Sequence, residues 1–394
     1  MARGEAAPSF GKAPSLRQVA EIAGVSTATV SRVMNTPDLV SEALRQRVAA
    51  VVERLGWVPD GAARALATRR TGTIGAIFPT LTHGDFARGL EGLQAELTRL
   101  GFTLLLACSE YSPEQEYRQA RKLVERGVDG IVLVGSLHHP SLPALLARNH
   151  VPLVETFVFD PNRPGTCVGP DNHRALFRLT RHLIGLGHRR IGVIAQDATA
   201  NDRAGARLAG IRDALAQHGL AVPPAHYAEG RWTIREGRTL FRRIAATDPP
   251  PTALICGNAY LAVGAMLESQ AMGIAVPGAM SIVGYDDIEL MAELPIPITT
   301  VRVAGDEVGR RAARHLIARL RGDAPTEAAE CEADLVLRAS CGKPPTVPDT
   351  YPPPACPPPA PPPYRTAPSA RDPSHRRGRP RKAPRSGSAP PAGC

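Results

Sequence analysis

Residues 27–35, TATVSRVMN, combine short hydroxyl side chains with one arginine. An arginine can bind the major-groove edge of guanine with two hydrogen bonds, and small hydroxyl side chains can approach the DNA backbone closely. The candidate contacts of this segment are Thr27, Ala28, Thr29, Ser31, Arg32 and Asn35. We expect Thr27, Ala28 and Arg32 to face bases. The other three are expected to contact phosphate or to hold the helix.

A second group of polar and aromatic residues lies further along the chain, beside short apolar runs. A carboxylate, an amide, an arginine and an indole ring suit a small polyhydroxylated or carboxylated ligand, because hydrogen bonds orient the ligand and the ring covers its apolar face. Each residue also has an ordinary structural interpretation as a helix cap, a turn residue or core. Together they favour a pocket. The candidates are Asp85, Phe86, Arg203, Arg207, Trp232, Asn258 and Asp286.

Three short helices are expected to position the first group. Ser15 and Gln18 have the spacing of a capping box, which begins a helix at the next residue. Gly24 supplies the turn that ends this helix, and Ser26 and Ser41 are placed to cap two more. The pattern predicts a helix-turn-helix unit with a third, supporting helix. An ordinary three-helix bundle with solvated polar faces is the alternative.

Alternating apolar runs and amphipathic segments are expected to position the second group. Apolar strands that alternate with helices indicate parallel sheets covered on both faces, here as two doubly wound lobes of an α/β core. Ligands of such sheets bind beyond the carboxyl ends of the strands, so the cleft between the lobes is the expected site. Trp232 is expected on a further strand-like stretch, Tyr227–Thr233. The seven runs are Thr73–Phe78, Thr103–Ala107, Gly130–Val134, Val151–Val154, Arg190–Ala195, Thr252–Cys256 and Met280–Gly284.

Several short motifs resemble those of the lactose/galactose-repressor (LacI/GalR) family, in that family's order and spacing. The resemblance covers roughly residues 15–341. Its N-terminal motifs are Ala23-Gly24-Val25-Ser26, Thr29-Val30-Ser31-Arg32-Val33-Met34-Asn35, Val58-Pro59 and Ala63-Arg64-Ala65-Leu66. Those of the core include Asp171-Asn172, Gly187-His188-Arg189-Arg190, Arg207-Leu208-Ala209-Gly210, Cys256-Gly257-Asn258 and Val283-Gly284-Tyr285-Asp286-Asp287.

The resemblance implies a regulator that binds a near-palindromic double-stranded DNA operator as a homodimer and responds to a small-molecule effector. It implies a core like that of periplasmic sugar-binding proteins, with effector contacts at the positions of Phe86, Arg207, Trp232, Asn258 and Asp286. It also implies that residues 58–70 form a hinge helix whose Leu66 wedges into the minor groove, which kinks DNA. A flexible basic linker is the alternative for this segment.

Two departures from the family pattern bear on the effector. The family often has an aspartate after the asparagine, where this chain has Ala259, and an acid near the end of the fourth strand, where this chain has Phe157. Both departures remove carboxylates from the set that binds neutral sugars. With Arg203 and Arg207 available, an acidic ligand such as a sugar acid becomes the expectation.

Charge and composition divide the chain into five parts. The net charge is +10, of which residues 1–70 carry +4 and residues 343–394 carry +7, so the middle is nearly neutral and the basic ends suit a polyanion. Residues 343–394 hold 18 of the 39 prolines, which predicts a disordered tail. The expected parts are a disordered start (1–14), a helix-turn-helix headpiece (15–57), a hinge (58–70), an effector-binding and dimerisation core (71–341) and a Pro/Arg-rich tail (342–394).

The tail contains Arg377-Gly378-Arg379-Pro380, which resembles an AT-hook for A·T-rich minor grooves, although nonspecific attraction to phosphate explains it as well. The seven cysteines are scattered without C-x-x-C spacing, so we expect reduced thiols and no metal site. Without a catalytic motif, a cofactor motif or a long apolar run, we expect a non-enzymatic, cytoplasmic, nucleoid-associated protein.

Two other classes remain as alternatives at this stage. The core alone would suit a solute-binding protein, and the two basic ends would suit an architectural DNA-binding protein with a vestigial pocket. The N-terminus lacks the apolar segment of a signal peptide, and the headpiece is fused to the core, which disfavours the first alternative. A discrete palindromic operator would distinguish the regulator from the second.

Overall fold

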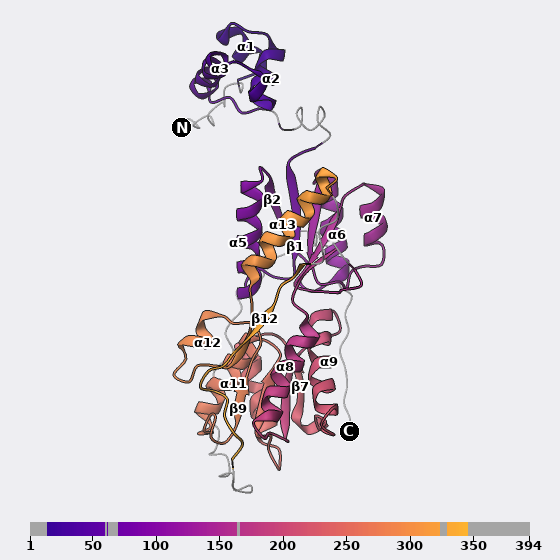
Figure 1. The fold of residues 1–394 in the computed structure, drawn as a ribbon, viewed down its shortest axis with the longest axis vertical. Coiled ribbons are helices and arrows are strands. Elements are labelled where there is room, and N and C mark those ends of the chain that lie inside the picture. The colour runs from indigo at the N-terminus through magenta and orange to yellow at the C-terminus, as the bar shows by residue number, and fades with distance from the viewer. Residues whose placement is uncertain (1–13, 60, 62–69, 164–165, 324–328, 346–394) are drawn as a thin grey trace, which may run out of the picture. The chain divides into compact units, whose positions relative to one another are not determined.

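The computed structural model describes residues 14–59, 61, 70–163, 166–323 and 329–345. Most of the predicted hinge, with Leu66, and the Arg377-Gly378-Arg379-Pro380 motif lie outside these residues. Figure 1 traces the described elements along the chain. Within the described residues, no helix combines the length and the apolar character that crossing a membrane requires.

The headpiece is a small helical unit with its own apolar core. The predicted capping box is confirmed: Gln18 N donates to Ser15 Oγ, and Ser15 N donates to the Gln18 side chain. Gly24 ends the first helix in the left-handed conformation, at φ +62°. Val30 and Val48 are fully buried at the centre of the unit. Its elements are α1 (Leu16–Ala23), α2 (Thr27–Asn35), η1 (Pro37–Leu39) and α3 (Glu42–Leu55).

The first lobe of the core is built on a six-stranded, wholly parallel sheet. Its strand order is β11-β5-β4-β3-β1-β2, so the chain winds outward in both directions from the middle. The strands are β1 (Thr73–Phe78), β2 (Thr103–Cys108), β3 (Gly130–Val134), β4 (Leu153–Thr156), β5 (Cys167–Gly169) and β11 (Ala329–Glu330). The helices are α5 (Gly84–Arg99), α6 (Pro113–Glu125), α7 (Leu142–Arg148) and α13 (Gly305–Arg321).

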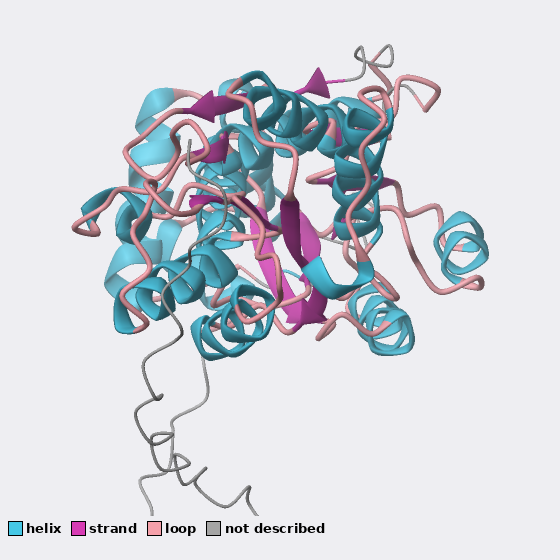
Figure 2. Cartoon of the chain, turned by 90° about the horizontal axis from the view of Figure 1, so that it is seen from below, coloured by secondary structure: helices cyan, strands magenta, loops and turns pink. Residues whose placement is uncertain are grey.

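The second lobe repeats the doubly wound plan with four parallel strands in the order β7-β6-β8-β9. Figure 2 shows central strands with helices on both sides. The strands are β6 (Ile191–Gln196), β7 (Tyr227–Gly230), β8 (Ala253–Cys256) and β9 (Ser281–Val283). The helical segments are α8 (Asn172–Gly185), α9 (Asp202–Ala216), η2 (Pro224–His226), α10 (Ile234–Ala245), α11 (Ala259–Ala271) and α12 (Glu289–Glu293).

A two-stranded antiparallel pair, β10 (Thr300–Val303) with β12 (Ala333–Val336), completes the core. Between these strands the chain forms α13, which packs against α5 of the first lobe (Figure 1). The two helices approach closely because both have glycines at the contact. A Cβ at Gly92 would lie 2.0 Å from the Asp306 carbonyl oxygen, and one at Gly309 would lie 2.0 Å from the Gly89 carbonyl oxygen. Larger side chains at these two positions would force the helices apart.

Two sequence-based expectations need correction in the core. The strand-like stretch Tyr227–Thr233 is too long, because β7 ends at Gly230 and Trp232 lies in the bend that precedes α10. The described chain also continues past the expected limit at residue 341, as far as residue 345. Gly342 N donates to Ser281 Oγ, and the Gly342 carbonyl oxygen bonds the buried His188 ring.

Candidate functional site

An enclosed pocket lies where the carboxyl ends of strands from both sheets meet, as the rule for open α/β sheets predicts. We call it the inner pocket. Its lining side chains leave only about 30 Å³ of free space, so a ligand of sugar size would have to move them apart. Residues at or after the ends of β1, β2, β4, β5, β6 and β9 line it. The polar side chains among them are His83, Asp85, Tyr111, Asn172, Gln196, Asn201, Arg203, Arg207, Tyr285 and Asp286.

Arg207 is a buried cation held in a fixed orientation. Its Nη1 donates to Asn172 Oδ1 at 2.9 Å, and its guanidinium lies 4.5 Å from the centre of the Tyr285 ring. The amide of Asn172 is itself fixed, because Nδ2 donates to the Phe157 carbonyl oxygen at 3.0 Å and Oδ1 accepts from the Tyr285 hydroxyl at 3.1 Å. The Nε of Arg207 is buried without a hydrogen-bond partner. An anion in the pocket would supply the missing acceptor.

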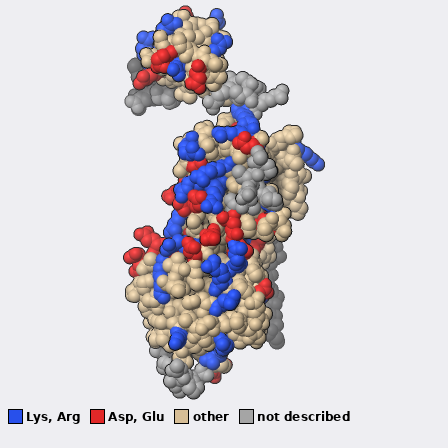
Figure 3. Space-filling view, in the orientation of Figure 1, with Lys and Arg blue, Asp and Glu red and all other residues tan. Residues whose placement is uncertain are grey.

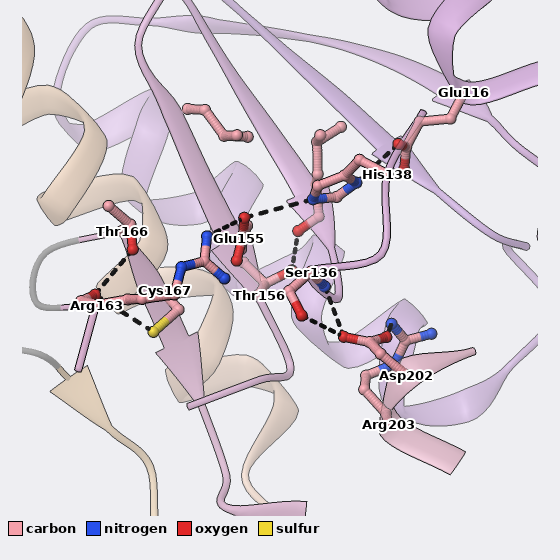
Figure 4. A network of polar contacts seen from close by, with 12 residues as sticks. Glu116, Ser136, His138, Glu155, Thr156, Arg163, Thr166, Cys167, Asp202 and Arg203 are labelled. Atoms are coloured by element: carbon pink, nitrogen blue, oxygen red, sulfur yellow. Dashed lines mark hydrogen bonds and ion pairs between the residues drawn. The ribbon is translucent and has the colours of Figure 1, made fainter. Parts of the chain in front are cut away.

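Arg203, one helical turn earlier on α9, connects the pocket to the other lobe. Its Nη1 donates to Asp202 Oδ1 at 3.0 Å. The second oxygen of Asp202 accepts from Ser136 N at 2.6 Å and from Ser136 Oγ at 2.8 Å, across the lobe boundary (Figure 4). Gly135 allows this contact, because a Cβ there would lie 2.0 Å from Arg203 Nη1. One carboxylate therefore links a pocket arginine to the first lobe.

Two carboxyl groups and a histidine form the opposite wall. Asp85 is only 1% exposed, and neither of its carboxyl oxygens has a hydrogen-bond partner. Burial, with Asp286 beside it, raises the pKa of Asp85 well above the ordinary value. His83 Nε2 lies 3.4 Å from Asp286 Oδ2, but burial lowers the pKa of His83, which favours the neutral ring. This wall offers unpaired oxygens to the hydroxyl groups of a ligand.

The structure brings together five of the seven predicted effector residues: Asp85, Phe86, Arg203, Arg207 and Asp286 all line the inner pocket. Asn258 does not line it, because its Oδ1 accepts from Leu261 N at 3.0 Å and caps α11. Trp232 also lies outside it and instead lines a second cavity.

Sequence reasoning missed several lining residues. Gln196 ends β6, and Asn201 caps α9 in the following loop, so a rule that considers every polar residue after a strand would have found both. Tyr285 directly precedes the predicted Asp286 and would have been found in the same way. His83 and Tyr111 lie several residues after their strands, within longer loops. Their approach to the pocket depends on tertiary packing and leaves no periodic signal.

The proposed recognition helix α2 is formed as expected. Thr27, Ala28, Ser31, Arg32 and Asn35 are exposed, whereas Val30 and Val33 face the headpiece core. The other polar side chains are partly engaged within the helix, since Asn35 Nδ2 donates to Ser31 Oγ at 3.2 Å and Thr29 Oγ1 bonds Ser26 Oγ at 2.8 Å. Both roles predicted for Thr29, Ser31 and Asn35, contact with phosphate and holding the helix, are compatible with these contacts. Arg32 is the long cationic side chain on the exposed face of α2.

A separate buried network lies within the first lobe, beside the contact between Ser136 and Asp202 (Figure 4). His138 Nδ1 lies 2.8 Å from Glu116 Oε1, and its Nε2 lies 3.5 Å from Glu155 Oε1. Glu155 also pairs with Arg163. Glu155 lies two residues before Phe157, but it does not line the inner pocket. Glu155, the carboxylate near the end of β4, therefore pairs with side chains inside the first lobe and is not available to a ligand in the inner pocket.

His138 gives the core a specific dependence on pH. Burial alone would lower its pKa, but the hydrogen bond to Glu116 and the nearby carboxylate of Glu155 outweigh burial and raise the pKa to about 9. The charged ring thus contributes stability that is complete below the ordinary histidine pKa and is lost as the pH rises through about 9. We expect His138→Gln to lower the free energy of unfolding by about 2 kcal/mol at pH 7 and by much less at pH 9.5.

Thermal denaturation of the parent protein and of His138→Gln between pH 6 and pH 9.5 measures this pH-dependent loss of stability. The exposed His150 provides the control, and His150→Gln should follow the parent curve throughout. A constant gap in melting temperature between the parent and His138→Gln across this range would contradict a charged His138.

A helix-turn-helix headpiece joined to a two-lobed core with a small-molecule pocket defines a ligand-responsive transcriptional regulator. Residues 15–60 match the bacterial regulatory proteins of the lacI family, and residues 180–341 match a periplasmic binding protein-like domain. The HTH-type transcriptional regulator GntR of Escherichia coli K12 is 31% identical over 317 residues, which cover 80% of this chain and 94% of GntR. The chain therefore belongs to the lacI family.

Two solved structures show the same architecture. The lac repressor dimer bound to operator and the anti-inducer ONPF aligns with a TM-score of 0.76 at 26% identity, and the alignment covers 84% of this chain and 99% of that one. The transcriptional regulator CelR in complex with cellobiose aligns with a TM-score of 0.61 at 29% identity, over 83% of this chain and all of CelR. Because the chain belongs to this family of regulators, we set aside the alternatives of a solute-binding protein and an architectural DNA-binding protein.

Proposed function

We propose that this regulator is a repressor whose effector is a small polyhydroxylated acid, such as a sugar acid. The observation that carries the proposal is the pairing of two buried arginines, Arg203 and Arg207, with the unpaired carboxyl group of Asp85 in one pocket. The arginines would bind the carboxylate of the effector, and Asp85 and Asp286 would bind its hydroxyl groups. CelR binds cellobiose, which supports a carbohydrate-like effector for this chain as well.

The proposed DNA contacts lie in the headpiece and the hinge. Thr27, Ala28 and Arg32 would read bases from α2, and Leu66 of the hinge would insert at the operator centre. The mixed charges on the core support this division, because basic and acidic side chains lie interspersed over the upper and middle part of the core's face in Figure 3. Many are paired, as in the contacts of Glu96 with Arg99 and Arg314.

A homodimer would place two headpieces on the two halves of an operator. The lac repressor is a dimer on its operator, and the edge strand β2 of this chain supports the same assembly. Leu105 and Leu106 of this strand are 37% and 42% exposed, in a run of three leucines. An uncovered apolar edge strand invites pairing with another chain, so a second copy is the proposed partner. A cytoplasmic location, without enzymatic activity, is part of the same proposal.

Thermal shift and operator binding together test the effector class. Gluconate and related sugar acids should raise the melting temperature, whereas neutral sugars and purines at equal concentration should not. The active acid should also change operator affinity, and operator DNA must change the affinity for the acid by the same factor. If neutral sugars or purines raise the melting temperature and sugar acids do not, the proposal of an acidic effector is wrong.

A further inference from the structure

The proposed acidic effector would bring a negative charge into a pocket that already contains carboxyl groups. Arg203 and Arg207 supply two positive charges. Asp286 and Asp202, which pairs with Arg203, balance these two charges when both are ionised. If Asp85 were ionised as well, the site would carry a net negative charge and would repel an anion. The charge of Asp85 therefore decides whether an acid can bind.

Asp85 lies in the first turn of α5, where free backbone N–H groups ordinarily stabilise a carboxylate by hydrogen bonds. Its side chain gains nothing from this position. Asp85 is only 1% exposed, and among the described residues neither of its carboxyl oxygens has a hydrogen-bond partner. An ionised carboxylate buried without a hydrogen bond is costly, so the geometry favours the neutral acid.

The elements packed around Asp85 do not offset this cost. Burial is the main influence on Asp85 and raises its pKa well above the ordinary value. Arg88, one turn later on α5, opposes burial, but its Nη2 donates to a backbone carbonyl oxygen of the loop after β9 at 3.0 Å. In the loop before α5, burial lowers the pKa of His83 and favours the neutral ring. On α13 the neighbour is Gly305, which has no side chain.

The loop after β9 brings a second carboxyl group beside Asp85. Asp286 lies close enough for a proton on one of the two groups to form a hydrogen bond to the other. Its backbone is left-handed, at φ +64°, so the surrounding structure holds this residue in place. The next residue, Asp287, is instead paired with two arginines. Tyr260 and Tyr285 also face the two carboxyl groups, and burial raises the pKa of both hydroxyl groups, which keeps them neutral.

We propose that Asp85 carries a proton in the folded protein at neutral pH, donates it in a hydrogen bond to Asp286, and thereby determines that the pocket accepts an anionic ligand. The proton removes the negative charge that would repel the acid. Binding of the acid and binding of the proton then favour each other, so raising the pH weakens binding of the acid. The choice of ligand rests on the proposed acidic effector, whereas the proton on Asp85 does not.

The melting temperature as a function of pH tests the proton without a ligand. Because the pKa of Asp85 is raised in the folded protein, the stability that the neutral acid contributes is complete below the unfolded pKa and is lost as the pH rises through the folded pKa. Asp85→Asn has a side chain of the same size that stays neutral. Its melting temperature should exceed that of the parent by a margin that grows from pH 5 to pH 9, to about 4 °C or more. Glu91→Gln, which removes an exposed carboxylate from the same helix, should follow the parent curve.

Calorimetric titration with gluconate between pH 6 and pH 9 tests the effect on the ligand. The affinity of the parent protein should fall by about ten-fold or more over this range, because the proton is lost and the pocket gains a negative charge. Asp85→Asn should keep an almost constant affinity, close to that of the parent at pH 6. Glu91→Gln should again behave like the parent.

The outcomes separate this inference from the proposed effector. If the margin in melting temperature between Asp85→Asn and the parent stays constant from pH 5 to pH 9, Asp85 is ionised and the inference is overturned. If the margin grows but gluconate does not bind at any pH, the acidic effector fails and the proton on Asp85 stands. If gluconate binds the parent equally well at pH 6 and pH 9, the role of Asp85 in accepting an acid is overturned.

A measurement on the parent protein alone covers the case in which Asp85→Asn does not fold. The infrared spectrum in heavy water at neutral pH should contain the carbonyl band of a neutral carboxyl group. Its absence would show that Asp85 is ionised.

Discussion

Replacing Arg207 with methionine is expected to weaken binding of an acidic effector by about 100-fold, because each hydrogen bond to a charged group contributes about 1.5–3 kcal/mol. Methionine retains much of the apolar volume but removes the charge and the spare Nε donor. Asn172 Oδ1 would still accept from the Tyr285 hydroxyl, so the change leaves this buried acceptor with a partner. Calorimetric titration with the acid that gives the largest thermal shift measures the loss.

Arg212 supplies a matched control for Arg207. It lies on the same helix, α9, and is exposed, so Arg212→Met removes an equal charge away from the inner pocket. Effector affinity should stay within about two-fold of the parent value, since exposed charges act weakly through solvent. An equal loss in both variants would mean that long-range charge alone attracts the acid. An unchanged affinity in Arg207→Met would remove Arg207 from the site.

Replacing Arg32 with alanine is expected to lower operator affinity by about 10- to 100-fold, because a bidentate contact with guanine contributes about 1–3 kcal/mol of discrimination. The substitution should also relax the preference at one base of each half-site. Arg32 is exposed on α2, so the headpiece core should be unaffected. Gel-shift titration against the operator and a set of single-base variants measures both effects.

Arg47, exposed on α3, is the control for charge in the headpiece. Arg47→Ala removes the same charge and should weaken binding only modestly and equally across sequences. If Arg32→Ala weakens operator and scrambled DNA by the same factor, then Arg32 contacts phosphate and the base-reading assignment is wrong.

Local signals predicted the elements that carry most of the fold. The capping box at Ser15 and the left-handed Gly24 are encoded within a few residues, so the headpiece could be read directly from the chain. The buried strands β1 and β3 are continuous apolar runs, which is the pattern of parallel strands covered on both faces. β5 and β11 have three and two residues, which is too short for any period to show.

Helix α13 shows a different limit of sequence reasoning. It is 17 residues long and amphipathic, so its presence leaves a local signal, whereas its neighbours in the fold leave none. Its place in the first lobe depends on glycine contacts with α5, more than 200 positions earlier, and such pairing leaves no local trace. Asn172 illustrates the same limit in the site. Its sequence motif was noted, but only the fold shows that it supports Arg207 and Tyr285.

One cause explains why Trp232 and Asn258 do not line the inner pocket. Trp232 and Asn258 both lie after strands, as ligand residues do, but a strand end does not specify which way the following side chain points. Asn258 uses its oxygen to cap α11, and Trp232 packs between His83 and Tyr260. Asn258 contacts Leu261, only a few residues away, whereas Trp232 contacts His83, more than a hundred residues earlier in the chain.

Gly135 lies at the contact between the two lobes of the core, where there is no room for a side chain. Its backbone is left-handed, at φ +83°, and a Cβ there would lie 2.0 Å from Arg203 Nη1 and 2.5 Å from Asp202 Oδ1. A single added carbon atom would thus act as a wedge between the lobes, without touching the DNA-binding surface. A substitution at position 135 is therefore expected to abolish the response to the effector and to leave the recognition of the operator unchanged.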